Sequence, residues 1–156
     1  MATRLESRSA ELSRLIEAAD GDRQRRIAVR VAEAALAAVP LDEPESASAL
    51  ADLAAGRRGG PGMRSAAALT ERLDDLAWDI QEKVDESRAE QAEYLEAFRR
   101  ARAVNAVVFA LGADDARQAA LEAAYEAEAA TEDLALIRRI VDEVMGGEQA
   151  PEQPRA

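Results

Sequence analysis

The feature that most constrains the fold is an amphipathic pattern that runs from Met63 to Gly112 with no glycine or proline between its ends. Its side chains recur in steps of three and four, which indicates α-helix and not β-strand. The stripe comprises Leu69, Leu73, Leu76, Ile80, Val84, Tyr94, Leu95, Phe98, Ala101, Asn105, Val108 and Phe109. One uninterrupted helix would span roughly 75 Å, which is long for a compact domain. Of the two readings, one long helix or two, we favour an antiparallel pair with a break between Asp85 and Ala89.

The remaining segments predict shorter helices that pack against this stripe. The chain has 156 residues and is 48% hydrophobic, but only 3% of its residues are aromatic and much of the apolar content is alanine. Alanine has the highest helix propensity, whereas a sheet draws on β-branched and aromatic residues. We therefore expect one all-α domain over residues 1–146, a bundle of about five to seven helices. The polar, proline-containing segment 147–156 is expected to be a disordered tail.

Capping residues and helix breakers predict where the shorter helices begin and end. The expected ranges are residues 3–19, 22–39, 44–55 and 115–145, the last with a polar interval at 126–133. Gly21 is the expected stop of the first helix and Asp22 the expected N-cap of the second. Leu50 and Leu53 should anchor the third helix. In the polar interval, either Thr131 caps a new helix or the last helix continues.

Charge and missing residue types exclude several classes of function. The net charge is −11, from 31 acidic and 20 basic residues, and this sign repels nucleic-acid phosphates and anionic membranes. The chain has no cysteine and no histidine, which excludes disulfides, thiolate zinc sites, cysteine nucleophiles and histidine bases. No apolar run approaches the length of a membrane span or a secretory signal. We expect a cytoplasmic protein without a cofactor that binds neither nucleic acid nor membranes.

Glu71 and Asp74 are the candidate metal ligands. Their E-x-x-D spacing places two carboxylates on one helical face, and carboxylate oxygens suit Mg²⁺. The spacing resembles the second half of the metal motif of the all-α nucleoside-triphosphate pyrophosphatases, although the upstream EE-x-x-E helix of that family is missing. The alternative is a solvated acidic face with helical ion pairs to Arg72 and Lys83.

Trp78 is the candidate partner-binding residue. It lies off the apolar stripe, beside Asp74, Asp75, Asp79 and Asp85. An exposed tryptophan among carboxylates has the composition of an interface hot spot that receives arginine or lysine. The alternative is a ring on the flank of the core that packs under a neighbouring helix.

Three further polar features have structural explanations in the sequence. The block Glu90, Glu93 and Glu96, followed by Arg99, Arg100 and Arg102, predicts ion pairs along one helix. Arg102 and Asn105 lie on the apolar stripe, so we expect them to make satisfied contacts between helices. The alternative is that they form a ligand site. Arg57 and Arg58 form a basic spot in the glycine-rich segment 56–62, which is expected to be an exposed loop.

Part of the chain resembles a known family. The run RRIAVRVAEAALAAVP (residues 25–40), an acidic linker, SALADLAAGRRGG (residues 48–60) and MRSAAALTERL (residues 63–73) are similar to the small all-helical immunity proteins of the Imm5-like group. The features that match are the central pair Ala32 and Glu33 and the alanine-rich helix that ends at Gly56. The resemblance covers about residues 23–75 and implies a protein that neutralises a toxin domain and catalyses nothing.

The leading hypothesis is therefore an acidic protein-binding module, such as an immunity protein or antitoxin, that binds a basic, toxin-like protein through Trp78, Asp74, Asp75 and Asp79. The alternatives are a Mg²⁺-dependent pyrophosphatase that uses Glu71 and Asp74, and a scaffold or homodimer that self-associates through an alanine-rich face.

Overall fold

The computed structural model describes residues 3–112 and 114–147, and within these ranges it contains seven α-helices, one short 3₁₀ helix and no strand. The elements are η1 (Leu5–Ser7), α1 (Ala10–Ala18), α2 (Gly21–Ala38), α3 (Pro44–Ala55), α4 (Pro61–Asp85), α5 (Gln91–Gly112), α6 (Ala116–Thr131) and α7 (Leu134–Gly147). They pack into one bundle, so the predicted all-α class is confirmed. The predicted tail lies outside the described residues apart from Gly147. None of the described helices combines the length and the apolar character of a membrane span.

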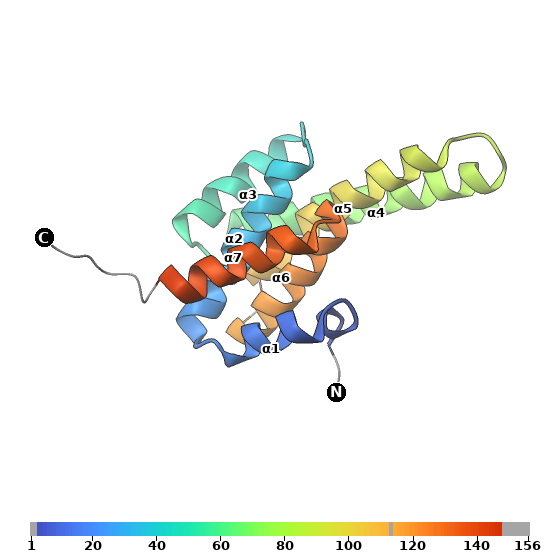
Figure 1. Ribbon diagram of the computed structural model, residues 1–156. Coiled ribbons are helices and arrows are strands. Elements are labelled where there is room, and N and C mark those ends of the chain that lie inside the picture. Colours follow the sequence, from blue (N-terminus) through green and yellow to red (C-terminus); the bar gives the residue numbers. More distant parts are fainter. Residues whose placement is uncertain (1–2, 113, 148–156) are drawn as a thin grey trace, which may run out of the picture.

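Helices α2, α5 and α6 form the centre of the bundle (Figure 1). Their inner faces consist largely of alanine, which lets helix axes approach closely. On α6 the buried alanines are Ala119, Ala120, Ala123, Ala124, Ala127 and Ala130. Larger side chains from the outer helices, among them Leu12, Ile16 and Ile137, close the core. The abundant alanine is therefore used for packing inside the bundle.

Helices α4 and α5 form an antiparallel hairpin whose outer half projects beyond the other helices (Figure 1). The predicted break is confirmed, because α4 ends at Asp85 and α5 begins at Gln91. Ser87 makes the turn in the left-handed region, with φ of 61°, and its N–H donates to the Val84 carbonyl. A serine in this conformation explains why no glycine or proline marks the turn.

Two predicted core leucines are exposed instead. Leu76 on α4 is 41% exposed and Leu50 on α3 is 44% exposed. Figure 1 shows that the outer half of α4 lies beside α5 alone, so a single neighbour covers only a narrow face there. Ala77, not Leu76, lies on that buried face. On α3, Leu53 is buried as predicted, whereas Leu50 lies at the edge of the buried face that Ala49, Asp52 and Leu53 form.

Several predicted helix ends are wrong by a few residues. The expected first helix is split, because Ser9 accepts a hydrogen bond from the Leu12 N–H (3.1 Å) and starts α1 after η1. Asp20, not Asp22, caps α2, so Gly21 is the first helical residue and not a stop. In each case the cap is the side chain that reaches a free N–H of the first turn, six residues after the predicted start for α1 and two residues before the predicted cap for α2.

The polar interval between α6 and α7 is a true break. Helix α6 ends at Thr131, and Glu132 adopts a left-handed conformation with φ of 54°. The next helix is capped by Asp133, whose carboxylate accepts from the Leu136 N–H at 3.0 Å. Of the two predicted alternatives, a new helix is thus correct, but Thr131 is not its cap.

The glycine-rich loop between α3 and α4 is closed by a buried carboxylate. Asp52 is 3% exposed, and its Oδ2 accepts a hydrogen bond from the Gly62 N–H at 2.8 Å. Its other oxygen pairs with Arg57. The Gly59 N–H donates to the Leu111 carbonyl at 2.8 Å, which ties the loop to the end of α5. The loop is exposed, as predicted, but both of its ends are held by the core.

Candidate protein-binding surface

The outer surface of α4 carries an acidic face centred on Trp78. A helix turns about 100° per residue, so side chains three, four, seven and eleven positions apart share one side. We define the Trp78 face as Glu71, Asp74, Asp75, Trp78, Glu82 and Asp85. The Trp78 side chain is 67% exposed, the most exposed large apolar residue described. The sequence alternative in which this ring packs under a neighbour is therefore wrong.

Basic side chains are absent from the Trp78 face over residues 71–85. Lys83 lies five positions after Trp78, about 140° around the helix. Arg72 turns away and pairs with Glu45 of α3 at 2.9 Å, so the predicted helical pairs with Arg72 do not form. Asp79 flanks the face. Among the described residues, neither Asp75 nor Asp79 has a salt-bridge partner, so both present uncompensated charge.

Asp74 differs from its acidic neighbours because an arginine of α5 already holds it. The Arg102 Nη2 donates to Asp74 Oδ1 at 2.6 Å. The same guanidinium donates through Nη1 to Glu126 Oε1 of α6 at 2.8 Å. Arg102 therefore joins α4, α5 and α6 at the base of the projecting hairpin, as expected of a contact between helices, but it is not fully satisfied, because its buried Nε has no hydrogen-bond partner among the described residues.

Glu126 is the centre of this network. Its residue is fully buried, and Arg4 donates to its second oxygen at 2.7 Å. The Arg4 guanidinium lies 4.3 Å from the centre of the Tyr125 ring and also binds Glu122. The segment before α1 is thus attached to α6 by charge-assisted hydrogen bonds and a cation–π contact.

The sequence interpretation treated Glu126 only as part of a polar interval. The sequence signals its burial only weakly: Ala123, Ala127, Ala129 and Ala130 lie near it on the helix, but so do Glu122 and Glu128. A mainly apolar helix packs on several neighbours, and a carboxylate inside it needs basic partners. Arg99, Arg100 and Arg102 likewise pair with Glu132, Glu43 and Glu126 on other elements, so the predicted ion pairs along α5 do not form.

The candidate metal pair gains little support from its surroundings. Glu71 and Asp74 share the Trp78 face, but the Asp74 carboxylate is occupied by Arg102. A divalent ion there would have to displace a guanidinium that also pairs with Glu126. Across the described ranges, no three acidic side chains come together as a metal would require.

No protein-family model, curated protein or solved structure matches this chain. The resemblance of residues 23–75 to the Imm5-like immunity proteins stays a prediction. Function is therefore inferred from the surface itself.

Proposed function

We propose that this protein is an acidic protein-binding module that captures a basic partner through the Trp78 face, in the manner of an immunity protein or antitoxin. The observation that carries the proposal is the 67% exposure of the Trp78 side chain at the centre of a carboxylate-lined helix face. Large aromatic anchors that become buried on binding dominate the affinity of protein interfaces.

The charges around Trp78 favour a basic partner. Five carboxylates share its face, and Asp75 and Asp79 have no salt-bridge partner among the described residues. Such a field accelerates encounter with a positively charged surface and repels acidic ones. A guanidinium of the partner could lie over the Trp78 ring while it pairs with a neighbouring carboxylate.

The hairpin is suited to presenting this face. Its outer half projects from the bundle (Figure 1), so a partner can contact α4 without meeting other helices. Its base is held by the contacts of Arg102 with Asp74 and Glu126. A face that is rigid before binding loses less conformational entropy on association.

The alternatives have less support. Asp74 is engaged by Arg102, which disfavours the pyrophosphatase hypothesis. The alanines proposed for self-association are largely buried in α2, α5 and α6.

The test is capture of a partner from the source cell, followed by titration with the purified partner. We expect one dominant basic protein whose affinity falls steeply with salt. Trp78→Ala should weaken binding by about 30-fold or more, the size of a hot-spot truncation. Asp75→Asn with Asp79→Asn should slow association and flatten the salt dependence.

Two matched variants separate a specific surface from general effects. Leu50→Ala removes another exposed apolar side chain, and Asp22→Asn removes an exposed carboxylate of α2. Both should bind like the unmodified protein. Salt-insensitive binding, an acidic partner or full affinity of Trp78→Ala would contradict the proposal.

A further inference from the structure

The projecting hairpin carries a second row of aromatic side chains, on α5, that the Trp78 face does not include. Tyr94 and Phe98 are half-buried, and their stacked rings have centres 5.9 Å apart. The Arg102 guanidinium lies 5.6 Å from the centre of the Phe98 ring and also donates to Asp74 of α4 at 2.6 Å. Phe98 and Asp74 therefore lie on the same side of the hairpin.

The contact between Arg102 and Asp74 also aligns the two helices. Side chains four positions apart are neighbours on a helix, about 6 Å apart along its axis. Trp78 comes four residues after Asp74, and Phe98 comes four residues before the arginine. Because α4 and α5 run antiparallel, these two rings lie level with each other (Figure 1). Tyr94 follows one turn farther from the bundle.

Arginine is the residue with which this protein covers its other aromatic rings. Arg4 lies 5.9 Å from the centre of the Phe109 ring and 4.3 Å from the centre of the Tyr125 ring. The same guanidinium pairs with Glu122, close to Tyr125 in the sequence, at 2.8 Å. A ring beside a carboxylate thus binds a planar guanidinium, which stacks on the ring and pairs with the carboxylate.

Trp78 and Tyr94 offer the same combination without an arginine. They are the aromatic residues over which no guanidinium lies in the described part of the chain. Asp75 and Glu82 flank Trp78, and among the described residues neither carboxylate has a salt-bridge or hydrogen-bond partner. Glu82 lies one turn beyond Trp78 and therefore level with Tyr94. We call Trp78, Phe98, Tyr94, Asp75 and Glu82 the aromatic hairpin surface.

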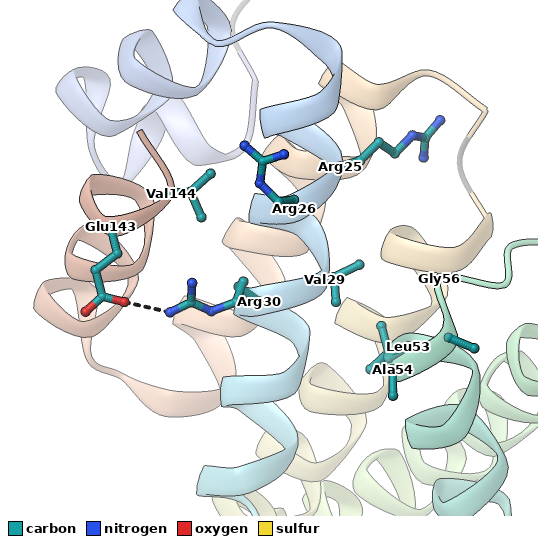
Figure 2. A pocket seen from close by; sticks show the side chains of 10 residues that line it. Arg25, Arg26, Val29, Arg30, Leu53, Ala54, Gly56, Glu143 and Val144 are labelled. Carbon is teal, nitrogen blue, oxygen red and sulfur yellow. Dashed lines mark hydrogen bonds and ion pairs between the residues drawn. The ribbon is translucent and has the colours of Figure 1, made fainter. Parts of the chain in front are cut away.

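The groove between α2, α3 and α7 has no comparable free charge. Its lining includes three arginines, and Figure 2 shows that Arg30 is held by Glu143 of α7, with Nη2 donating to Oε1 at 2.6 Å. Arg25 and Arg26 have partners as well. Charge in this groove is thus compensated within the chain, whereas the aromatic hairpin surface presents carboxylates that are not.

We propose that the aromatic hairpin surface binds a helical segment of the partner that carries arginines one turn apart. This inference rests on the proposed function and names the element that the partner contributes. One guanidinium stacks on Trp78 and pairs with Asp75, and the next stacks on Tyr94 and pairs with Glu82. A helix suits this surface because its side chains repeat with the same rise as those of α4 and α5. Lysine suits it less well, because an ammonium group lacks the planar face that stacks.

The experiment is isothermal titration calorimetry of the full chain with three alanine-based peptides of about 20 residues, a length that forms helix in water. The first carries arginine at every fourth position, and the second carries lysine at the same positions. The third has the same number of arginines at every second position, which places them on opposite sides of a helix. The first should bind with a dissociation constant below about 100 μM, about threefold or more tighter than the other two. Emission from Trp78, the single tryptophan, should shift to shorter wavelength as the ring is covered.

Tyr94→Leu tests the part of the surface that α4 does not provide. It removes the ring, keeps apolar bulk and should weaken binding of the first peptide by about threefold or more, the effect of losing one cation–π contact. Circular dichroism checks that this variant folds. Glu82→Gln, at an exposed position, should weaken binding to a similar extent without altering a packed residue.

The controls lie on the opposite side of the same hairpin. Leu76→Ala and Glu96→Gln change exposed residues two positions from Trp78 and Phe98, about 200° around each helix. Both should bind the first peptide like the unmodified protein.

Three results would overturn the inference: no binding of the first peptide, equal binding of the lysine peptide, or full affinity of Tyr94→Leu or Glu82→Gln. If Trp78→Ala loses the first peptide and Tyr94→Leu does not, contact is confined to α4, and the proposed function stands without this inference. If the natural partner binds Trp78→Ala with full affinity, both proposals fail.

Discussion

Replacing the buried Glu126 by glutamine tests the account of the hairpin base most directly. The carboxylate accepts from Arg4 at 2.7 Å and from Arg102 at 2.8 Å. A hydrogen bond that involves a charged group contributes about 1.5–3 kcal/mol, and a neutral one about 0.5–1.5 kcal/mol. Glutamine retains one neutral acceptor, and its amide turns a donor toward the guanidinium that loses its partner.

The expected loss in the free energy of unfolding is about 3–4 kcal/mol, close to the cost of breaking a buried ion pair. For a domain of this size each kcal/mol lowers the melting temperature by about 2–4 °C, so Tm should fall by about 10 °C. Urea unfolding should be followed by far-UV circular dichroism, because the single tryptophan, Trp78, is already exposed and reports poorly on folding.

The matched control is Glu122→Gln, whose side chain is 23% exposed and binds the same Arg4. It should cost less than about 1 kcal/mol, as exposed pairs do. In double-mutant cycles, Glu126 should couple more strongly to Arg102, 15% exposed, than to Arg4, 45% exposed. A Glu126→Gln protein within about 1 kcal/mol of the unmodified one would refute the reasoning.

Three further predictions concern the loops and the link between α3 and α5. Gly62→Ala should lower the free energy of unfolding by about 1–3 kcal/mol, because its Cβ would lie 2.5 Å from Asp52 Oδ2. Urea unfolding measures this, and an unchanged midpoint would contradict it by showing that α3 moves away from the added methyl group at no cost. Burial raises the pKa of Glu43, but the Arg100 guanidinium outweighs this and holds the pKa below its usual value. Glu43→Gln should therefore lower the free energy of unfolding by its full amount at neutral pH, and this difference from the unmodified protein should disappear as the pH falls through the folded pKa of Glu43. Urea unfolding at several pH values measures the difference, and a pH-independent difference would contradict the prediction. Ser87→Gly should raise the free energy of unfolding by about 0.5–1 kcal/mol, because glycine adopts a positive φ without strain. Thermal unfolding measures this, and an unchanged melting temperature would contradict it.

The sequence predicted the helical class and most of the breaks, because these depend on local properties. Steps of three and four define an amphipathic helix wherever it packs, and Pro44 and Gly56 bound α3 as expected. The turn between α4 and α5 was predictable from the length of the stripe, without any marker residue. The absence of cysteine and histidine likewise excluded disulfides, thiolate zinc sites, cysteine nucleophiles and histidine bases.

The candidate surface was predicted in part. Trp78 lies off the apolar stripe, and helical spacing alone places it among Asp74, Asp75 and Glu82. The sequence could not show that Asp74 is held by Arg102, because that partner comes from another helix.

Tertiary structure alone decided which helix lies at the centre and which carboxylate is buried. Alanine-rich α6 has almost no local signal of burial, yet neighbours cover it on several sides and enclose Glu126. The groove between α2, α3 and α7 also exists only in the assembled bundle. Burial and pairing depend on which faces meet in space, and a single chain's periodicity describes one helix at a time. Local pattern therefore determined the helices, and packing determined the site.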